Sequence, residues 1–299
     1  MRTIDTIPEL QEMARVARWL AERGWAEANA GNCSVRLSRT RDDLLSPDAA
    51  SGGGPSTGRH SADSPSRGGR ASGGGAGGKM PVPAPDLAGD LLLITGSLRR
   101  MRDVAVVPEE NVALIRILPA GEGYLHLWGA SPVTSEFPAH AAIHAVLKRA
   151  KPSLRAVLHT HPTHLIALTH LPAYADKPDV VLDRLLRLHP ETRFHLPAGV
   201  GSIPYRIPGS LELGEATAQA LEEFDIVLWK KHGVVAVAES LSRAFDRVEV
   251  LAKAAEIYLA VLAAGQDPTL IEGDQMALTR EAYRRRARGE VTERTDSNR

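Results

Sequence analysis

The chain has a single cysteine, Cys33, among its 299 residues. One thiol cannot form a disulfide within the chain, and this usage is typical of proteins from a reducing compartment, so we expect a cytoplasmic protein. An excess of charge of one sign is also missing, because lysine plus arginine and aspartate plus glutamate number 36 each. Without a net positive field, neither a nucleic acid nor a membrane is expected as a partner, and a small molecule is favoured.

Long hydrophobic runs are absent as well. The apolar segment IYLAVLAAG, residues 257–265, is far shorter than the roughly 20 residues that a membrane-spanning helix needs. The first residues, MRTIDTIPELQEMARVARWLAERG, carry too many charges for the apolar core of a secretory signal. The hydrophobic content of 43% is nevertheless sufficient to bury a substantial core. These features predict a globular protein without a transmembrane segment.

The order of hydrophobic patterns predicts the domain organisation. Apolar residues recur at helical spacing before Gly24, whereas CSVRLS, DLLLITGS, VALIRIL, GYLHLWG and LRAVLHTH have the composition of strands. The sequence therefore predicts an α/β fold, a single domain with a central, mainly antiparallel β-sheet flanked by helices. That domain is expected to comprise residues 1–45 and 87–270. Residues 46–86, rich in glycine, serine and proline, are predicted to be a disordered insertion, and residues 271–299 a polar C-terminal segment.

Three histidines end an apolar run in AVLHTHPTH, residues 156–164. In a β-strand, residues i and i+2 lie on the same face, so His159 and His161 would project together. Catalytic zinc sites generally use three protein ligands, often imidazole nitrogens, and leave one position open. The pair alone is weak evidence, because two histidines with ordinary hydrogen bonds at the end of a strand have the same spacing. A metal site requires a third ligand.

The third ligand is not fixed by spacing, and the candidates are His140, His144, His164, His170, His189, His195 and His232. His232 is favoured because it lies in KKHGVV, where a turn interrupts two strand-like pieces and could present a ligand beside the sheet. His140 and His144 are one helical turn apart and could form a metal-binding face, but the edge of an ordinary amphipathic helix is the favoured interpretation. His164 stays unassigned.

Glu136 opens a predicted helix directly after Thr134 and Ser135. The free amides of a helix start and two hydroxyl groups favour an anion such as phosphate, and a carboxylate beside them could bind a metal or transfer a proton. A glutamate that only complements the helix dipole would have the same position. The loops NAGN, residues 29–32, and TGS, residues 95–97, could also hold a phosphate, although each alone indicates only a turn.

Together and in this order, five segments resemble the class II aldolase/adducin family: ANAGN, ITGS, TSEFPAH, VLHTHPTHLIALT and KKHGVVAVAESL. Within that family the likeness is greatest to the bacterial enzymes that act on L-rhamnulose 1-phosphate, because GYLHLWG, PAGVGSIPYRIPG and GEATAQALEEFDIVLW are also similar to their segments. The resemblance implies a metal-dependent aldehyde-lyase, an enzyme that breaks a carbon–carbon bond. The expected reaction cleaves L-rhamnulose 1-phosphate, a sugar phosphate of rhamnose catabolism, to dihydroxyacetone phosphate and L-lactaldehyde.

The resemblance also implies roles for individual residues. His159, His161 and His232 match the family's zinc ligands, with one Zn²⁺ per subunit, and Glu136 matches its acid/base glutamate. Glu191 matches a second catalytic glutamate that reaches the site of a neighbouring subunit, since the family's enzymes are commonly fourfold-symmetric homotetramers. The positions that match the phosphate and substrate pocket are Asn29, Gly31, Asn32, Ser97, Thr134 and Ser135.

Other functions of the same scaffold remain open from the sequence. An aldolase for fuculose or deoxyribulose 1-phosphate, a sugar-phosphate dehydratase and an epimerase would all share the metal site. An adducin-like interaction module without catalysis is less favoured, because it would be expected to lack the metal ligands. The segment TGSLRR departs from the family pattern, since Leu98 and Arg99 follow where a further small residue is expected.

Overall fold

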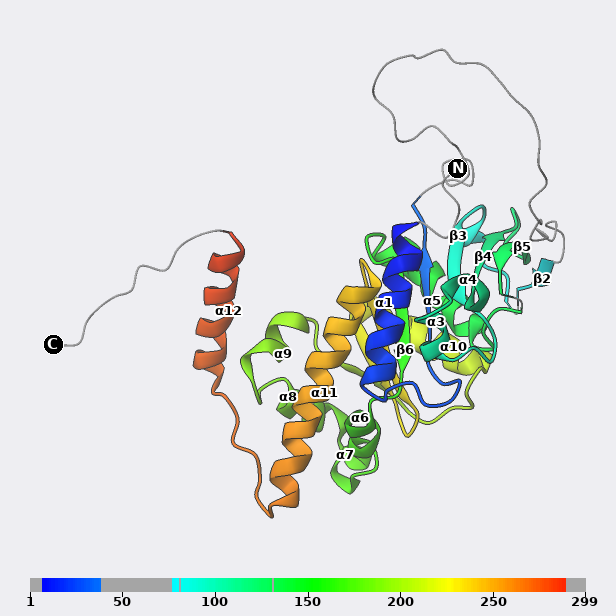
Figure 1. Cartoon of the computed structure of the whole chain (residues 1–299). Helices are drawn as coiled ribbons and strands as arrows, with labels where there is room; N and C mark the ends of the chain where they lie inside the picture. The colour runs from blue at the N-terminus through cyan, green and yellow to red at the C-terminus, as the bar shows by residue number, and fades with distance from the viewer. Residues whose placement is uncertain (1–6, 39–76, 81, 131, 289–299) are drawn as a thin grey trace, which may run out of the picture.

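The fold is built around one nine-stranded sheet, shown in Figure 1. The computed structural model describes residues 7–38, 77–80, 82–130 and 132–288. The strand order is β2-β5-β4-β3-β1-β6-β9-β8-β7, and among the described strands every neighbouring pair is antiparallel except β7 with β8. The strands are β1 (Asn32–Arg36), β2 (Gly77–Lys79), β3 (Leu91–Thr95), β4 (Val112–Ile117), β5 (Gly123–Gly129), β6 (Ala156–Thr160), β7 (Gly201–Ile203), β8 (Ile226–Trp229) and β9 (Gly233–Ala238). The predicted α/β fold with a mainly antiparallel sheet is confirmed.

Helices cover both faces of the sheet. Strand β3 illustrates why, since Leu91 and Leu93 join one hydrophobic core and Leu92 and Ile94 join another on the opposite face. The first core contains residues of α1 (Pro8–Glu22), α3 (Met101–Val104), α6 (Thr163–Leu168), α7 (Pro172–Asp176), α8 (Pro178–Leu185) and α11 (Leu241–Ala263). The opposite face is covered by η2 (Pro85–Leu87), α5 (Phe137–Ala150) and α10 (Leu211–Glu223). Two further helices are α4 (Pro108–Asn111) and α9 (Pro190–His195).

The beginnings of the two long helices that follow β7 and β9 are set by serine caps. Ser210 accepts a hydrogen bond from the backbone N–H of Leu213 at the start of α10, and Ser240 accepts one from Arg243 at the start of α11. Such a cap satisfies an amide that has no partner within the helix. Both helices thus start at residues that are defined by a side-chain cap.

The structure changes the predicted limits of the insertion. Residues 46–76 lie outside the described part of the chain, but Gly77–Lys79, within the predicted insertion, pairs with β5 at the edge of the sheet. Met80, Ala84 and Leu87 are buried in the core beneath η2. Placing the end of the insertion at residue 86 was therefore wrong, because apolar residues near its end contribute to the core.

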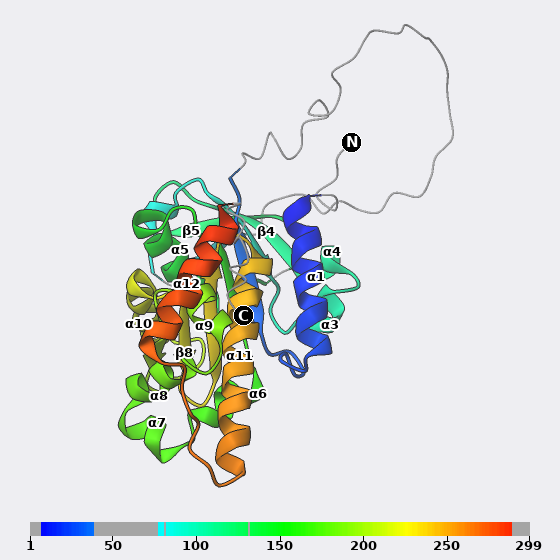
Figure 2. The ribbon, with the colours of Figure 1, turned by 90° about the vertical axis from the view of Figure 1, so that its left-hand side faces the viewer.

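The predicted polar C-terminal segment contains a helix, α12 (Gly273–Ala287), which follows α11 and contacts α9 (Figure 2). The ring of Tyr283 in α12 packs on Phe194 in α9, with 4.6 Å between the ring centroids. Among the described helices, none is long and apolar enough to cross a membrane.

Candidate metal centre and active site

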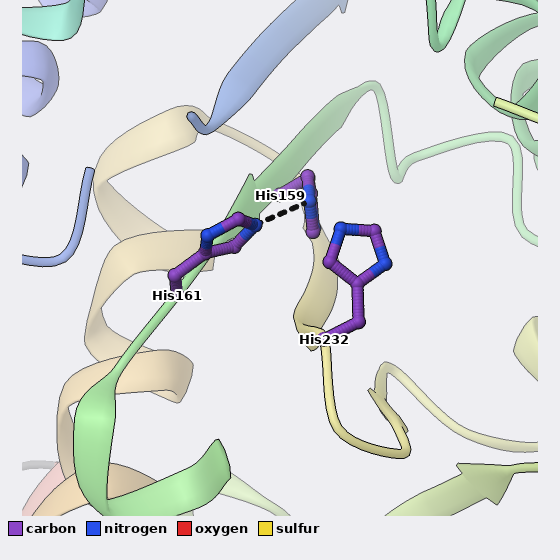
Figure 3. A group of neighbouring side chains, drawn as sticks. All are labelled: His159, His161 and His232. Carbon is purple, nitrogen blue, oxygen red and sulfur yellow. Dashed lines mark hydrogen bonds between the residues drawn. The ribbon is translucent and has the colours of Figure 1, made fainter. Parts of the chain in front are cut away.

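Three histidines converge at the end of the central strands, as Figure 3 shows. His159 lies in β6 and is paired with Asn32 of β1 on one side and Val235 of β9 on the other. His161 follows directly after β6, and His232 lies in the turn that joins β8 to β9. Because β6 and β9 are antiparallel neighbours, the last residues of β6 and the first residues of β9 lie at the same end of the sheet. The sheet therefore brings His232 beside a pair that precedes it by some 70 residues.

The imidazole nitrogens lie close enough to share one ion. Each histidine has a ring nitrogen within 4.8 Å of such an atom of the other two. His159 Nε2 and His161 Nε2 are 3.2 Å apart. Nitrogen ligands at about 2.0 to 2.1 Å from a central zinc would span distances of this order. The described residues include no other group of three such ligands.

Hydrogen bonds to the opposite ring nitrogens determine which atoms face the centre. His159 Nδ1–H donates to the carbonyl of Val234 at 3.0 Å, and His161 Nδ1–H donates to Glu27 Oε1 at 2.8 Å. With these protons on Nδ1, both Nε2 atoms carry lone pairs that point at each other and repel. A cation between them removes the repulsion, and this arrangement of second partners is the usual one for histidine metal ligands. The donor set fits a divalent metal.

Burial keeps two of the ligands, His159 and His232, in the neutral form that binds metal. Desolvation, and then the neighbouring His161, lower the pKa of His159 to about 3. Desolvation and the neighbouring His159 lower the pKa of His232 to about 4. The indole ring of Trp229 packs against both, with centroids 4.4 Å from His159 and 5.0 Å from His232. At neutral pH both rings are ready to accept a metal without first losing a proton.

Glu136 lies beside the three histidines, at the residue that precedes α5. Its Oε2 is 3.5 Å from His159 Nε2, and its Oε1 is 3.8 Å from His232 Nε2. Asn32 Nδ2 donates a hydrogen bond to Oε2 at 2.8 Å. The residue is buried, and its two carboxylate oxygens face His159 and His232. A group in this place can bind a metal or exchange a proton with a substrate.

The predicted phosphate-binding loops meet near Glu136. Gly96 pairs with Val133, Ser97 N–H donates to Pro132, and the backbone N–H of Glu136 donates to Thr134 Oγ1. Ser97 is half-buried and Ser135 is exposed. Through these contacts the 95–97 loop lies alongside residues 132–136.

The 29–32 loop approaches the histidines from the other side. Gly31 has φ of +77°, and a Cβ at this position would lie 3.3 Å from the carbonyl oxygen of His159. A larger residue would therefore disturb the metal-binding strand. Asn29 is exposed, and Asn32 uses its amide for protein contacts, which leaves one N–H for a ligand. Leu98 has φ of 58°, the left-handed region in which a small residue is preferred.

The comparisons with known proteins agree with this geometry. The family model "Class II Aldolase and Adducin N-terminal domain" matches residues 69–259. The chain belongs to the class II aldolase and adducin family. It is 36% identical over 269 residues to the rhamnulose-1-phosphate aldolase of Bacteroides thetaiotaomicron, covering 90% of this chain and 91% of that protein. It is 32% identical to the enzyme of the same name from Mannheimia succiniciproducens, covering 89% of each.

A solved aldolase structure is also similar to this chain. The crystal structure of a sugar-phosphate aldolase from Thermotoga maritima superposes with a TM-score of 0.71 at 35% identity, covering 87% of this chain and 97% of that one. The prediction of a class II aldolase most similar to rhamnulose-1-phosphate aldolases is confirmed, as is the prediction of a carbon–carbon lyase.

Glu191, another predicted site residue, belongs to a different part of the fold. It is in α9, where its carboxylate accepts hydrogen bonds from His189 Nδ1–H and the hydroxyl of Tyr283, both at 3.0 Å. It lines a cavity of about 450 Å³ together with Trp25, whose carbonyl accepts the backbone N–H of His161. Among the described residues, no hydrogen bond or ion pair joins Glu191 to the metal ligands, and its role toward a neighbouring subunit stays a prediction.

Several residues that surround the aldolase site had not been identified from the sequence. Glu27 and Trp229 support metal ligands, but nothing in their local sequence distinguishes them from other loop or strand residues. His140 and His144 are fully buried instead of forming the edge of an amphipathic helix. Their spacings of four and eight from Glu136 are a signal that could have revealed them, because residues at i, i+4 and i+8 share one face of a helix.

Proposed function

We propose that this protein is a zinc-dependent aldolase that cleaves L-rhamnulose 1-phosphate to dihydroxyacetone phosphate and L-lactaldehyde. The observation that carries the proposal is the convergence of His159, His161 and His232 with Glu136 in contact. The relatives that share about a third of their residues with this chain, over about 90% of its length, are named rhamnulose-1-phosphate aldolases, which favours that substrate.

Zinc is favoured because the three ligands are imidazoles, and burial lowers the pKa of His159 and His232 so that these two are neutral at pH 7. Three histidines with an open fourth position are a common donor set for catalytic Zn²⁺. A bound zinc ion supplies Lewis-acid stabilisation of the negative charge that develops on substrate oxygens, worth several kcal/mol. His159 and His161 are fixed for this purpose by Val234 and Glu27, which hold their protons on Nδ1.

Glu136 would transfer the proton to and from the reacting carbon. Cleavage of the C3–C4 bond requires a base to accept the proton of the C4 hydroxyl, and it leaves the bonding electrons on the three-carbon fragment as an enediolate. Protonation of its terminal carbon completes dihydroxyacetone phosphate. Glu136 is buried and points at the cluster, so it can hold that proton next to the carbon with little competition from water.

The three loops around Glu136 would bind the phosphate. Gly31, Asn32, Ser97, Thr134 and Ser135 offer backbone amides, hydroxyls and one amide N–H without a charged side chain of their own. Asn29, which is exposed, belongs to the same proposal. Binding energy from this remote group would fix the reacting carbon against the site.

The assembly and location complete the proposal. A fourfold-symmetric homotetramer would place Glu191 of one subunit near the metal site of the next, where it would act as a second catalytic residue. A cytoplasmic location accords with the single cysteine, Cys33. Light scattering of the purified protein measures the assembly state, and a monomeric active enzyme would contradict the role of Glu191 between subunits.

The proposed function is tested by metal analysis and a substrate panel. Purified protein should contain one zinc per chain and release dihydroxyacetone phosphate from L-rhamnulose 1-phosphate faster than from fuculose or ribulose 1-phosphate. Product formation can be followed by coupled reduction of dihydroxyacetone phosphate. His161→Ala should lose both zinc and activity, whereas His170→Gln, a change of an exposed histidine, should keep both. Zinc-loaded protein that cleaves none of these phosphates would refute the proposal.

A further inference from the structure

A continuous chain of buried polar side chains runs from Glu136 into the core between β1 and α5. Glu136 is bonded to Asn32, Asn32 to His140 at 2.6 Å, His140 to Ser34 at 2.7 Å, and Ser34 to His144 at 2.7 Å. The five side chains come from two segments of the chain. Asn32 and Ser34 lie two apart in β1, on one face, while Glu136 directly precedes α5 and His140 and His144 follow it at spacings of four within that helix. The contacts therefore alternate between strand and helix.

The chain has one self-consistent direction. A carboxylate only accepts hydrogen bonds, so Asn32 must present its Nδ2–H to Glu136 and its Oδ1 to His140. His140 then carries its proton on Nε2, and its Nδ1 accepts the hydroxyl proton of Ser34. The oxygen of Ser34 in turn accepts from Nε2–H of His144. Each group thus fixes the orientation of the next.

The far end of the chain agrees with this direction. His144 Nδ1 is buried and has no hydrogen-bond partner within the described residues. In the assigned direction this atom is a lone pair, whereas the reverse direction would bury an N–H donor without an acceptor, which occurs more rarely. Both histidines remain neutral, because burial lowers the pKa of His140 to about 4 and that of His144 well below its ordinary value.

We propose that Ser34, His140 and His144 are positioning residues that act through Asn32 to hold the Glu136 carboxylate toward the metal ligands. Without His140, the Asn32 amide is held only by its bond to Glu136, so the amide and the carboxylate bonded to it can adopt other orientations. The carboxylate would then move from its place beside His159 and His232. The inference rests on the proposed role of Glu136 in proton transfer, and it adds residues that do not touch substrate.

The first test reads the tautomers in metal-free protein, independently of any activity. With ¹⁵N-labelled histidine, the ring nitrogen shifts of His140 and His144 should both report the Nε2–H form, assigned with His140→Gln and His144→Gln samples. An Nδ1–H form of His140 would require Asn32 to turn its oxygen to Glu136 and would overturn the proposal. This measurement remains decisive even if the protein cleaves none of the sugar phosphates tested.

The second test compares His140→Leu with His140→Gln. Leucine removes the donor to Asn32, and kcat should fall about tenfold, as expected for one misdirected hydrogen bond, with KM and zinc content nearly unchanged. Glutamine can still donate an N–H to Asn32 Oδ1 and should recover most of the loss, although it lacks the contact with Ser34. Equal losses in both variants, or a loss in KM alone, would overturn the proposal.

Ser34→Ala provides the test if the leucine variant does not fold. It removes only the hydroxyl between the two histidines and is close in size to the original side chain. It should shift the tautomer equilibrium of His140 in the nitrogen spectrum and lower kcat by a smaller factor than His140→Leu. An unchanged spectrum together with an unchanged kcat would contradict the chain of contacts.

Discussion

Acid should destabilise the metal-free protein through its buried histidines, and His140 allows the effect to be isolated. Its pKa is about 4 in the folded chain, against an ordinary value of 6.5, mainly because burial disfavours the charged form. The nearby Glu136 opposes this shift and His159 adds to it. Between these two pH values the unfolded chain binds a proton that the folded chain does not, so the free energy of unfolding falls as pH falls.

The size of the effect follows from the two pKa values. pH 5 is about 1.5 units below the ordinary histidine pKa that applies to the unfolded chain, whereas the imidazole of His140 in the folded chain is still mostly neutral at this pH. One proton over that interval corresponds to about 2 kcal/mol. Replacing His140 with glutamine removes this titration, so between pH 7 and pH 5 the variant should lose about 2 kcal/mol less of its unfolding free energy than the wild type.

Urea unfolding of chelator-treated protein at a series of pH values measures the slope of the unfolding free energy against pH for the wild type and for His140→Gln. His170→Gln makes the same chemical change at an exposed histidine and should retain the slope of the wild type. The comparison uses slopes because glutamine also changes packing, which lowers stability equally at every pH. Parallel curves for His140→Gln and the wild type would show that His140 is not held neutral in the core and would refute the prediction.

Three further predictions concern the metal centre. Glu27→Gln removes the charge of the hydrogen-bond partner of His161. Since the Glu27 side chain is 65% exposed, zinc affinity measured by chelator competition should fall only about tenfold, the lower end of the usual range. The control Glu109→Gln should leave zinc affinity unchanged. Gly233→Ala would place a Cβ 2.6 Å from Thr160 O and 2.8 Å from His161 Cδ2. Zinc content should therefore drop, and the free energy of unfolding should fall by about 1–3 kcal/mol. The control Gly273→Ala, where no atom lies within 4 Å of the added Cβ, should change neither. Adding Zn²⁺ at about 1,000 times its Kd to metal-free protein should raise the unfolding free energy by about 4 kcal/mol, an increase absent from His161→Ala.

The strands and helices that carry the site could be predicted from hydrophobic periodicity. The segments AVLHTH and DIVLWKKHGVVAVAE have the patterns of strands and a turn, and they form β6, β8 and β9. His159 and His161 were expected on one face of a strand, and both reach the centre, although β6 ends at Thr160 and His161 lies just beyond it. Spacing within an element was sufficient there, because the two ligands are only two residues apart.

Contacts between distant elements could not be derived in the same way. Local context favoured His232 but could not place it, because its position depends on the register of β9 against β6. Glu27 accepts a hydrogen bond from His161, but it lies in the loop between α1 and β1. That loop has no periodic sequence pattern from which the direction of the side chain could be predicted. The predicted end of the insertion was wrong because β2 has only three residues, two of them glycine. Such a strand cannot be distinguished by composition from the glycine-rich segment before it.

His140 and His144 show how the sequence could have been used further. They follow Glu136 at spacings of four and eight, so a helix that turns Glu136 toward the site also turns both histidines toward the sheet. Imidazoles buried against a strand need hydrogen-bond partners, because an unpaired polar group in the core is costly. On β1 the polar residues Asn32 and Ser34 alternate with apolar neighbours and face the same side. The two patterns are complementary, and once one contact is known, Asn32 with Glu136, the remaining contacts follow from the geometry of a helix packed along a strand.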